Sequence, residues 1–157
     1  MSPRTDYFDD PKAPKANRIV PAVTAFVVND AGDVLMERRS DNGLWGMPGG
    51  VQEIGEDISG TVIREVLEET GILVDVVGLV GIFTDPGHVI EFSDGEVRQE
   101  FSLCFRARPV SGEIKVSSES LEVRWVPRAE LELLDVQPTA RRRMEEAFRD
   151  SPFPRIS

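Results

Sequence analysis

One short segment of the sequence constrains the fold more than any other: a helix-forming stretch that follows a glycine-rich loop. Apolar residues recur at helical spacing at Ile58, Val62 and Val66, and Gly71 stands where a glycine commonly ends a helix. We therefore predict a helix from about Ile58 to Thr70 with one apolar face. Such a helix must lie against another layer, such as a sheet, to bury that face.

The same helix carries a concentration of negative charge. Glu65, Glu68 and Glu69 are spaced i, i+3 and i+4, so they share one stripe of the helix. From Gly50 to Asp75 there are seven acidic residues and one basic residue, which accounts for −6 of the net charge of −10. Carboxylates this close repel one another, and an oxygen-only ligand set favours Mg²⁺ or Mn²⁺. The spacing alone also fits a solvated acidic face, so both interpretations stand at this point.

The composition narrows the class of protein. A chain of 157 residues fits one domain, and a net charge of −10 argues against nucleic acid as a partner. The one cysteine, Cys104, excludes an intrachain disulfide, and no apolar run approaches the roughly 20 residues that span a bilayer. The segment from Met1 to Asn17 has no apolar signal sequence. We therefore expect a cytoplasmic protein that contacts neither nucleic acid nor membrane.

The rest of the chain alternates β-rich segments with turns. Residues 1–17, rich in proline, are expected to form an irregular arm, and residues 84–97 a long surface loop. Two helices are expected near the C-terminus, over 128–134 and 139–149. Strands and helices are interleaved without strict alternation, which predicts a mixed sheet between helices. The expected strands cover residues 19–28, 34–38, 72–83, 98–108 and 122–126.

The segment Gly50–Ile72 resembles the Nudix box, GX5EX7REUXEEXGU, where U is a bulky aliphatic residue. Every fixed position is filled without a gap, by Gly50, Glu56, Arg64, Glu65, Val66, Glu68, Glu69, Gly71 and Ile72. The resemblance implies an α/β fold, a Nudix-type α/β/α sandwich with a mixed β-sheet. It implies a single Nudix hydrolase domain over residues 18–152, followed by a tail over 153–157, and it does not cover the arm.

Members of this family hydrolyse a nucleoside diphosphate linked to another moiety, X. The resemblance therefore implies divalent-metal-dependent cleavage of a pyrophosphate bond, giving a nucleoside monophosphate and phospho-X. ADP-ribose, nucleotide sugars and canonical or oxidised nucleoside triphosphates are the candidate substrates, and Mg²⁺ or Mn²⁺ the cofactor. The alternative is a non-catalytic regulator that binds a nucleotide metabolite on the same fold. A homodimer is compatible with either function.

The resemblance also assigns roles within the box. The expected metal ligands are Glu65, Glu68, Glu69 and the backbone carbonyl of Gly49. Arg64 is expected to pair with a carboxylate of the box, Glu56 first, and so to orient the ligands. We expect Arg64, Glu65 and Glu122 to be catalytic residues. The base itself stays unassigned among Glu65, Glu119 and Glu122.

Substrate-binding residues are less well defined by the sequence. Arg38 and Arg98 are candidates for contacting phosphate. Trp45 could stack on a nucleobase or belong to the core. His88, the one histidine of the chain, falls in the expected surface loop, where we expect it to be solvated.

Overall fold

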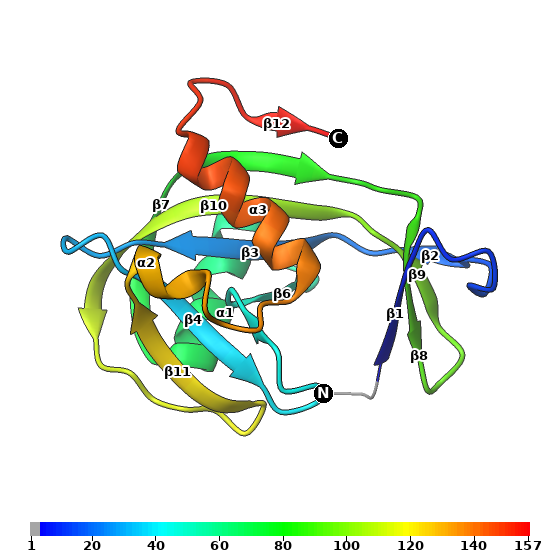
Figure 1. The fold of residues 1–157 in the computed structure, drawn as a ribbon, viewed down its shortest axis with the longest axis horizontal. Helices are drawn as coiled ribbons and strands as arrows, with labels where there is room; N and C mark the ends of the chain where they lie inside the picture. Colours follow the sequence, from blue (N-terminus) through cyan, green and yellow to red (C-terminus); the bar gives the residue numbers. More distant parts are fainter. Residues whose placement is uncertain (1–3) are drawn as a thin grey trace.

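The computed structural model describes residues 4–157, so the first three residues of the expected arm lie outside the described part of the chain. Twelve strands and three helices are formed within it (Figure 1). The helices are α1 (Ile58–Thr70), α2 (Arg128–Leu131) and α3 (Pro138–Arg149). The strands are β1 (Arg4–Phe8), β2 (Arg18–Ile19), β3 (Ala22–Val27), β4 (Val34–Arg39), β5 (Trp45–Gly46), β6 (Gly49–Val51), β7 (Ile72–Phe83), β8 (His88–Phe92), β9 (Val97–Gln99), β10 (Ser102–Gly112), β11 (Ser120–Val126) and β12 (Arg155–Ile156).

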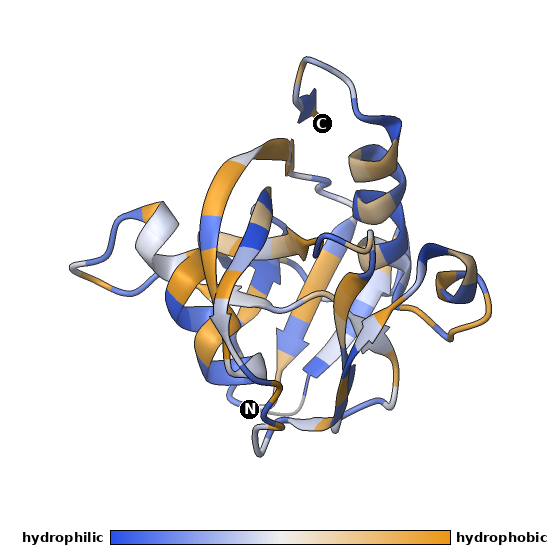
Figure 2. Ribbon diagram, turned by 90° about the vertical axis from the view of Figure 1, so that its left-hand side faces the viewer, coloured by the Kyte–Doolittle hydropathy of each residue, from blue (hydrophilic) through white to orange (hydrophobic). Residues whose placement is uncertain are grey.

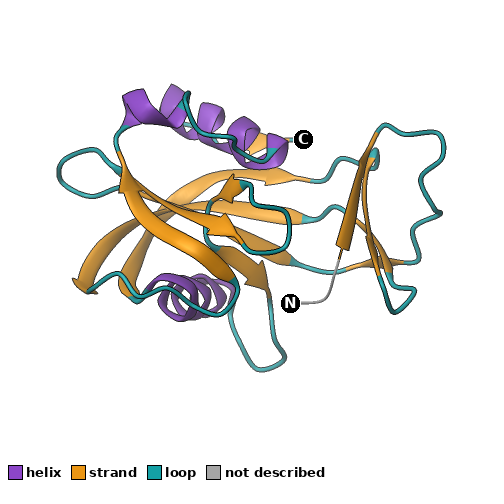
Figure 3. Cartoon of the chain, turned by 60° about the horizontal axis from the view of Figure 1, so that its bottom comes forward, coloured by secondary structure: helices purple, strands orange, loops and turns teal. Residues whose placement is uncertain are grey.

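The strands form a mixed, layered arrangement. The central sheet has the order β12-β7-β10-β3-β6, with β10 parallel to β3 and antiparallel to β7. A three-stranded sheet, β11-β4-β5, lies beside it, and a third sheet has the order β1-β8-β9-β2. Helix α1 lies on one side of the strands, and α2 and α3 lie on the other (Figure 3). The expected α/β class with a mixed sheet between helices is confirmed.

Alternation along β3 builds a core on each side of the sheet. Val23, Ala25 and Val27 pack with Val62 and Val66 of α1. On the opposite face, Phe26 packs with the residues that lie beneath α3. Side chains on a strand point alternately to its two faces, so one strand supplies both cores. Figure 2 shows the hydrophobic residues concentrated on the central strands.

Helix α1 spans the predicted residues because both of its ends are capped. The Asp57 carboxylate accepts a hydrogen bond from the Gly60 backbone N–H at 2.7 Å. Gly71 adopts a left-handed conformation, with φ at 80°, and its N–H donates to the Leu67 carbonyl. These caps fix the register of the three glutamates of the helix.

One expectation about an irregular segment was wrong, and two terminal segments contain short strands that the sequence did not predict. Residues 84–97 contain β8 and the start of β9, which pair as a hairpin whose turn includes Gly95, with φ at 91°. Within the expected arm, β1 pairs antiparallel with β8, and within the expected tail, β12 pairs with β7. Backbone hydrogen bonds from distant strands order these segments, and turn residues along the sequence do not reveal such pairing.

Two expected strands are interrupted. Pro21, which has no N–H to donate, separates β2 from β3. The segment expected from Arg98 to Arg108 divides into β9 and β10 around Glu100 and Phe101. The breaks let β2 and β9 leave the central sheet and pair with each other in parallel in the third sheet.

Candidate active site

The glycine-rich loop brings its backbone unusually close to its neighbours. A Cβ added to Gly49 would lie 2.1 Å from the Val23 carbonyl oxygen, on the adjoining strand β3. A Cβ added to Gly50 would lie 2.3 Å from the Glu65 carboxyl carbon. Only glycine allows these approaches. Strand β6 therefore places peptide groups directly against the first carboxylate of the acidic stripe.

Arg64 connects this loop to helix α1. Its guanidinium forms a bidentate pair with Glu56, Nη2 donates to the Val51 carbonyl at 3.1 Å, and Nη1 lies 2.8 Å from Glu65 Oε1. Nη1 is also 3.3 Å from Glu68 Oε2. Hydrogen bonds from Arg64 and from the Thr61 hydroxyl lower the pKa of Glu56 to about 2. The expected pairing of Arg64 with Glu56 is thus present, and the planar guanidinium of Arg64 links the loop to the helix.

The buried end of the stripe faces a second carboxylate that sequence reasoning missed. Glu69 is 6% exposed and Glu37, on β4, is 5% exposed. Burial, followed by the neighbouring carboxyls of Glu37 and Glu65, raises the pKa of Glu69 far above its ordinary value. Burial also raises the pKa of Glu37, although hydrogen bonds from Glu69 and Ser120 oppose that effect. Two facing buried carboxyls must share a proton or a cation.

A pocket of about 490 Å³ opens over these carboxylates. Four glutamates, from β4, α1 and the segment before β11, contribute to its wall together with the backbone of β6. Residues of the third sheet provide another part of the wall. The acidic side chains that line the whole pocket are Glu37, Glu65, Glu69, Asp94, Glu96, Glu100 and Glu119. The basic ones are Arg4, Arg39, Arg98 and Arg143, and His88 also lines the pocket.

The donor set fits a divalent cation. The side chains of Glu65, Glu69 and Glu37 offer only oxygen atoms, which hard cations prefer. Burial raises the pKa of Glu69 and of Glu37, and a bound positive charge would oppose that rise. Within residues 4–157, however, no three such side chains already converge on one point. The site therefore has the right chemistry, and ion binding would have to draw the carboxylates together.

The comparisons with known proteins decide the family. The family model described as NUDIX domain matches residues 18–148. The chain belongs to the NUDIX family. Two curated relatives of this NUDIX chain are a "MutT-like protein" from Streptomyces ambofaciens and an "ADP-ribose pyrophosphatase" from Methanocaldococcus jannaschii. The first relative is 40% identical over 67% of this chain and 62% of its own length. The second is 30% identical over 66% of this chain and 59% of its own length.

A solved structure supports the fold of this NUDIX chain. A NUDIX hydrolase from Nitrosomonas europaea superposes with a TM-score of 0.70, at 23% identity, over 87% of this chain and 93% of that one. Likeness at this identity speaks for the fold alone. The chain spans less than two thirds of the length of both curated relatives above.

Within this NUDIX chain, only part of the expected ligand set reaches the pocket. Gly49, Glu65 and Glu69 line it. The side chain of Glu68 is 60% exposed and lies outside the pocket wall, beside Arg64. Residues three and four positions apart share a helix face, but in this fold Glu65 and Glu69 lie on the pocket side of α1 and Glu68 lies on its exposed side. Sequence spacing alone does not specify which edge of that face turns toward the pocket.

Of the expected substrate-binding residues, too, only some line the pocket. Arg98 lines the pocket, with its guanidinium 4.3 Å from the Phe92 ring centre and Nε 2.7 Å from Glu96 Oε1. Arg38 lies outside the pocket wall and donates to the Gly43 carbonyl at 3.1 Å. Trp45 is 7% exposed in the core beneath α3. The structure brings Arg98 alone of these three to the pocket.

The candidate bases also occupy different places. Glu119 lines the pocket, and its backbone carbonyl accepts hydrogen bonds from the N–H and the hydroxyl of Ser40. Glu122 lies on β11, 3.5 Å from Arg124 Nε, outside the pocket wall. Glu122 was expected to be catalytic, but its position is that of a residue in a surface ion pair. Of the three candidate bases, Glu65 and Glu119 line the pocket.

This difference gives a paired prediction. We expect Glu119→Gln to lower kcat by about tenfold or more, because it removes a carboxylate from the pocket wall. We expect Glu122→Gln, the same substitution three residues away, to leave kcat within about twofold, since exposed ion pairs contribute little. Steady-state rates of both variants test this, and an equal loss in both would contradict it.

His88 is the other position where expectation and structure differ. It lines the pocket at 3% exposed, not in a solvated loop. Pairing of β8 with β1 and β9 buries it. A charged or polar residue in a strand that is buried on both sides gives no recognisable sequence signal, and the same holds for Glu37.

Across residues 4–157, helix length and polarity identify no membrane-crossing helix.

Proposed function

We propose that this protein hydrolyses the pyrophosphate bond of a nucleoside diphosphate linked to X, using Mg²⁺ or Mn²⁺, to give a nucleoside monophosphate and phospho-X. The observation that carries the proposal is the pocket in which Glu65, Glu69 and Glu37 face the glycine backbone of β6. Its volume suits a nucleotide-sized ligand. Membership of the NUDIX family and the name of the relative "ADP-ribose pyrophosphatase" support the same reaction class.

The charge of the pocket explains why a cation is needed. Seven carboxylates and four guanidiniums line it, so a pyrophosphate would be repelled by the acidic part of the wall. Glu65, Glu69 and the carbonyl of Gly49 would hold the cation, and Glu68 remains a predicted ligand that lies outside the wall. A bound divalent cation supplies charge neutralisation of the phosphates and acidification of a water molecule.

The chain's own residues then orient the reaction. Arg64 fixes the Glu65 carboxylate relative to the loop through its bond to Glu65 and its pair with Glu56. Glu65 or Glu119 accepts the proton of the attacking water. Arg98, stacked on Phe92 in the third sheet, contacts the part of the substrate away from the acidic wall.

A substrate panel tests the proposal. ADP-ribose, nucleotide sugars, dinucleoside polyphosphates and oxidised nucleoside triphosphates are incubated with Mg²⁺ or Mn²⁺, and the products are identified by mass spectrometry. We expect at least one member to yield a nucleoside monophosphate. Tight binding of one member without turnover would instead support a regulator that senses a nucleotide. The expected homodimer and cytoplasmic location remain predictions.

The acidic pocket predicts a characteristic pH dependence. Protonation of the ligand carboxylates releases a bound cation, so kcat/KM should fall as the pH is lowered into the acid range. The Arg64–Glu56 pair stabilises the fold fully above the ordinary pKa of Glu56, 4.5, and this effect is lost progressively as the pH falls from there through the lowered pKa of about 2. A pH profile at constant free Mg²⁺, with circular dichroism to confirm folding, tests this. A flat profile down to pH 4 would contradict it.

A further inference from the structure

The strand β1 lies outside the matched NUDIX domain and yet forms part of the pocket. The domain match begins at residue 18, whereas β1 covers Arg4–Phe8. It pairs antiparallel with β8 along its whole length, at the outer edge of the third sheet (Figure 1). Arg4, at its start, lines the pocket. An edge strand buries little apolar surface, so something else must hold it in place.

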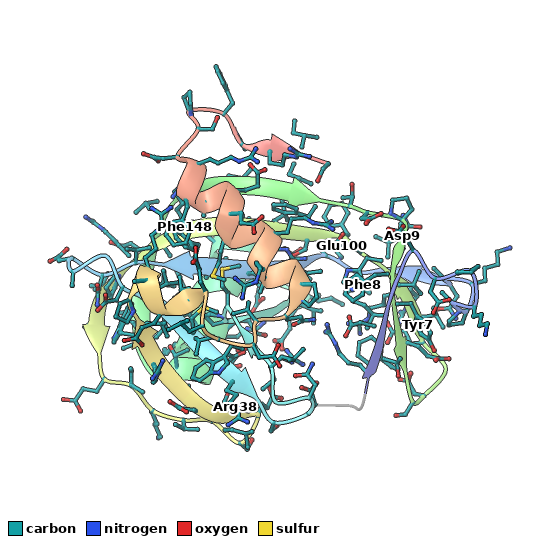
Figure 4. All side chains as sticks on the ribbon, viewed as in Figure 1. Tyr7, Phe8, Asp9, Arg38, Glu100 and Phe148 are labelled. Carbon is teal, nitrogen blue, oxygen red and sulfur yellow. The ribbon has the colours of Figure 1, made fainter. Side chains whose placement is uncertain are left out.

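The His88 side chain contacts both β1 and the body of the protein. Its Nε2 lies 2.9 Å from Asp6 Oδ1, and its ring stacks on Phe8 with the centroids 4.5 Å apart. On the other side, Nδ1 lies 3.6 Å from Glu100 Oε1. Figure 4 shows Phe8 and Glu100 near each other where the third sheet meets the central sheet. The imidazole therefore bridges a carboxylate of β1 and one of the body.

The bridge belongs to a longer chain of alternating charges. Beyond Glu100, Arg143 of α3 donates to Glu100 Oε1 at 2.7 Å, and both side chains are buried. Beyond Asp6, the guanidinium of Arg4 makes a bidentate pair with the carboxylate, at 2.9 and 3.1 Å. Positive and negative groups thus alternate from Arg4 in the pocket wall, through His88, to Arg143 on the opposite side of the junction. Removing the imidazole would leave Asp6 paired with Arg4 and Glu100 paired with Arg143, but it would break the side-chain link between the two pairs.

We propose that His88 is a positioning residue for the reaction: as an imidazolium between Asp6 and Glu100, it holds β1 against the body, so that Arg4 stays in the wall of the substrate pocket. The proposal rests on the proposed function for its kinetic consequence. The acidic partners of His88 are Asp6 and Glu100, not the expected cation ligands Glu65 and Glu69. We therefore expect loss of the bridge to weaken substrate binding and to leave the chemical step unchanged.

The electrostatic surroundings favour the charged imidazole. Burial alone would lower the pKa of His88, but the hydrogen bond to Asp6 and the nearby carboxylates of Asp6 and Glu100 raise it above its ordinary value. Each of these two carboxylates also pairs with an arginine: Asp6 with Arg4, and Glu100 with Arg143. Since the pKa is raised on folding, the bridge is fully formed below about pH 6.5 and is lost as the pH rises through the folded value.

Kinetics of matched variants test the proposal. We expect His88→Gln and Asp6→Asn each to raise KM by about tenfold, the effect typical of a lost hydrogen bond to a charged group, with kcat within about twofold. The probe is the member of the substrate panel with the highest kcat/KM, at fixed Mg²⁺. Tyr7→Phe is the control, because it removes the Tyr7–Glu91 bond between the same two strands while leaving the bridge intact. Unchanged KM in both test variants, or an equal rise in Tyr7→Phe, would overturn the proposal.

The pH dependence separates positioning from a general structural role. KM of the wild-type protein should rise as the pH passes the pKa of His88, and KM of His88→Gln should lack that rise. A KM that is elevated in His88→Gln but keeps the wild-type pH dependence would contradict the proposal.

A measurement without substrate makes the outcome independent of the proposed function. The chain has one histidine, so the imidazole signals of an untagged ¹⁵N-labelled sample belong to His88 alone. We expect both ring nitrogens to be protonated at pH 6.5, and Asp6→Asn to lower the titration midpoint and increase the backbone mobility of residues 4–8. If no panel member is hydrolysed but this result is obtained, the proposed function fails and the bridge stands. A neutral imidazole at pH 6, or a midpoint unaffected by Asp6→Asn, would refute the bridge.

Discussion

Replacing Glu69 with glutamine is expected to lower kcat by about 100-fold at saturating Mg²⁺ while the protein remains folded. Glu69 is buried and faces Glu37, so its carboxylate is the most enclosed of the three glutamates in the stripe. Glutamine keeps the shape of the side chain but loses the negative charge that a cation requires. The test is steady-state kinetics over a range of Mg²⁺ concentrations, together with circular dichroism.

Thermal unfolding distinguishes loss of a ligand from damage to the fold. In EDTA, Glu69→Gln should unfold at the same temperature as the wild type or higher, because the substitution relieves the repulsion between buried carboxyls. Mg²⁺ at 100 times its Kd should stabilise the wild type by about 2.7 kcal/mol and the variant by much less. The exposed Glu145→Gln on α3 is the matched control. A kcat within twofold of wild type, or an undiminished Mg²⁺ shift, would remove Glu69 from the site.

The sequence predicts helix α1 and its register well because local interactions determine both. Asp57 and Gly71 cap the ends, and the apolar residues Val62 and Val66 fix the buried face. Each of these signals lies within a few residues of the structure that it specifies. The same locality accounts for β7 and α3, whose limits lie at or beside the expected ones.

The third sheet could not be predicted in this way. Its strands β1 and β8 are separated by about 80 residues, and short edge strands carry no strong alternation. Gly95 and its neighbours indicate a turn correctly, but a turn can join two strands or stand in an open loop. The environment of His88 depends on that pairing, so its burial was not visible in the sequence.

The candidate site was predictable only where it lies on α1 and its loop. The motif identifies Glu65 and Glu69, but Glu37 comes from β4, and only packing of α1 against β3 and β4 brings it opposite Glu69. The motif also treats Glu68 as equivalent to its neighbours, whereas the structure leaves it on the outer side of the helix. Residue type and spacing define a set of carboxylates, and the packing of the helix in the fold determines which of them line the pocket.

Arg64→Ala is expected to lower kcat by about 10- to 100-fold, although Arg64 does not line the pocket. Arg64 holds Glu56, Glu65 and the Val51 carbonyl at once, so its removal frees the Glu65 carboxylate from the loop. The loss should be larger in kcat than in KM, because the orientation of the reacting groups is disturbed more than the pocket wall.

Arg64→Lys distinguishes the fork geometry from charge alone. A lysine keeps the positive charge but cannot make two parallel bonds to Glu56 while contacting Glu65, so we expect it to recover less than half of the lost activation free energy. The free energy of unfolding should change little in either variant, because solvent screens the Arg64–Glu56 pair. Arg108→Ala, which removes an exposed pair with Asp75, is the control for loss of a surface arginine. Full activity in Arg64→Lys would show that charge suffices, and full activity in Arg64→Ala would exclude any orienting role.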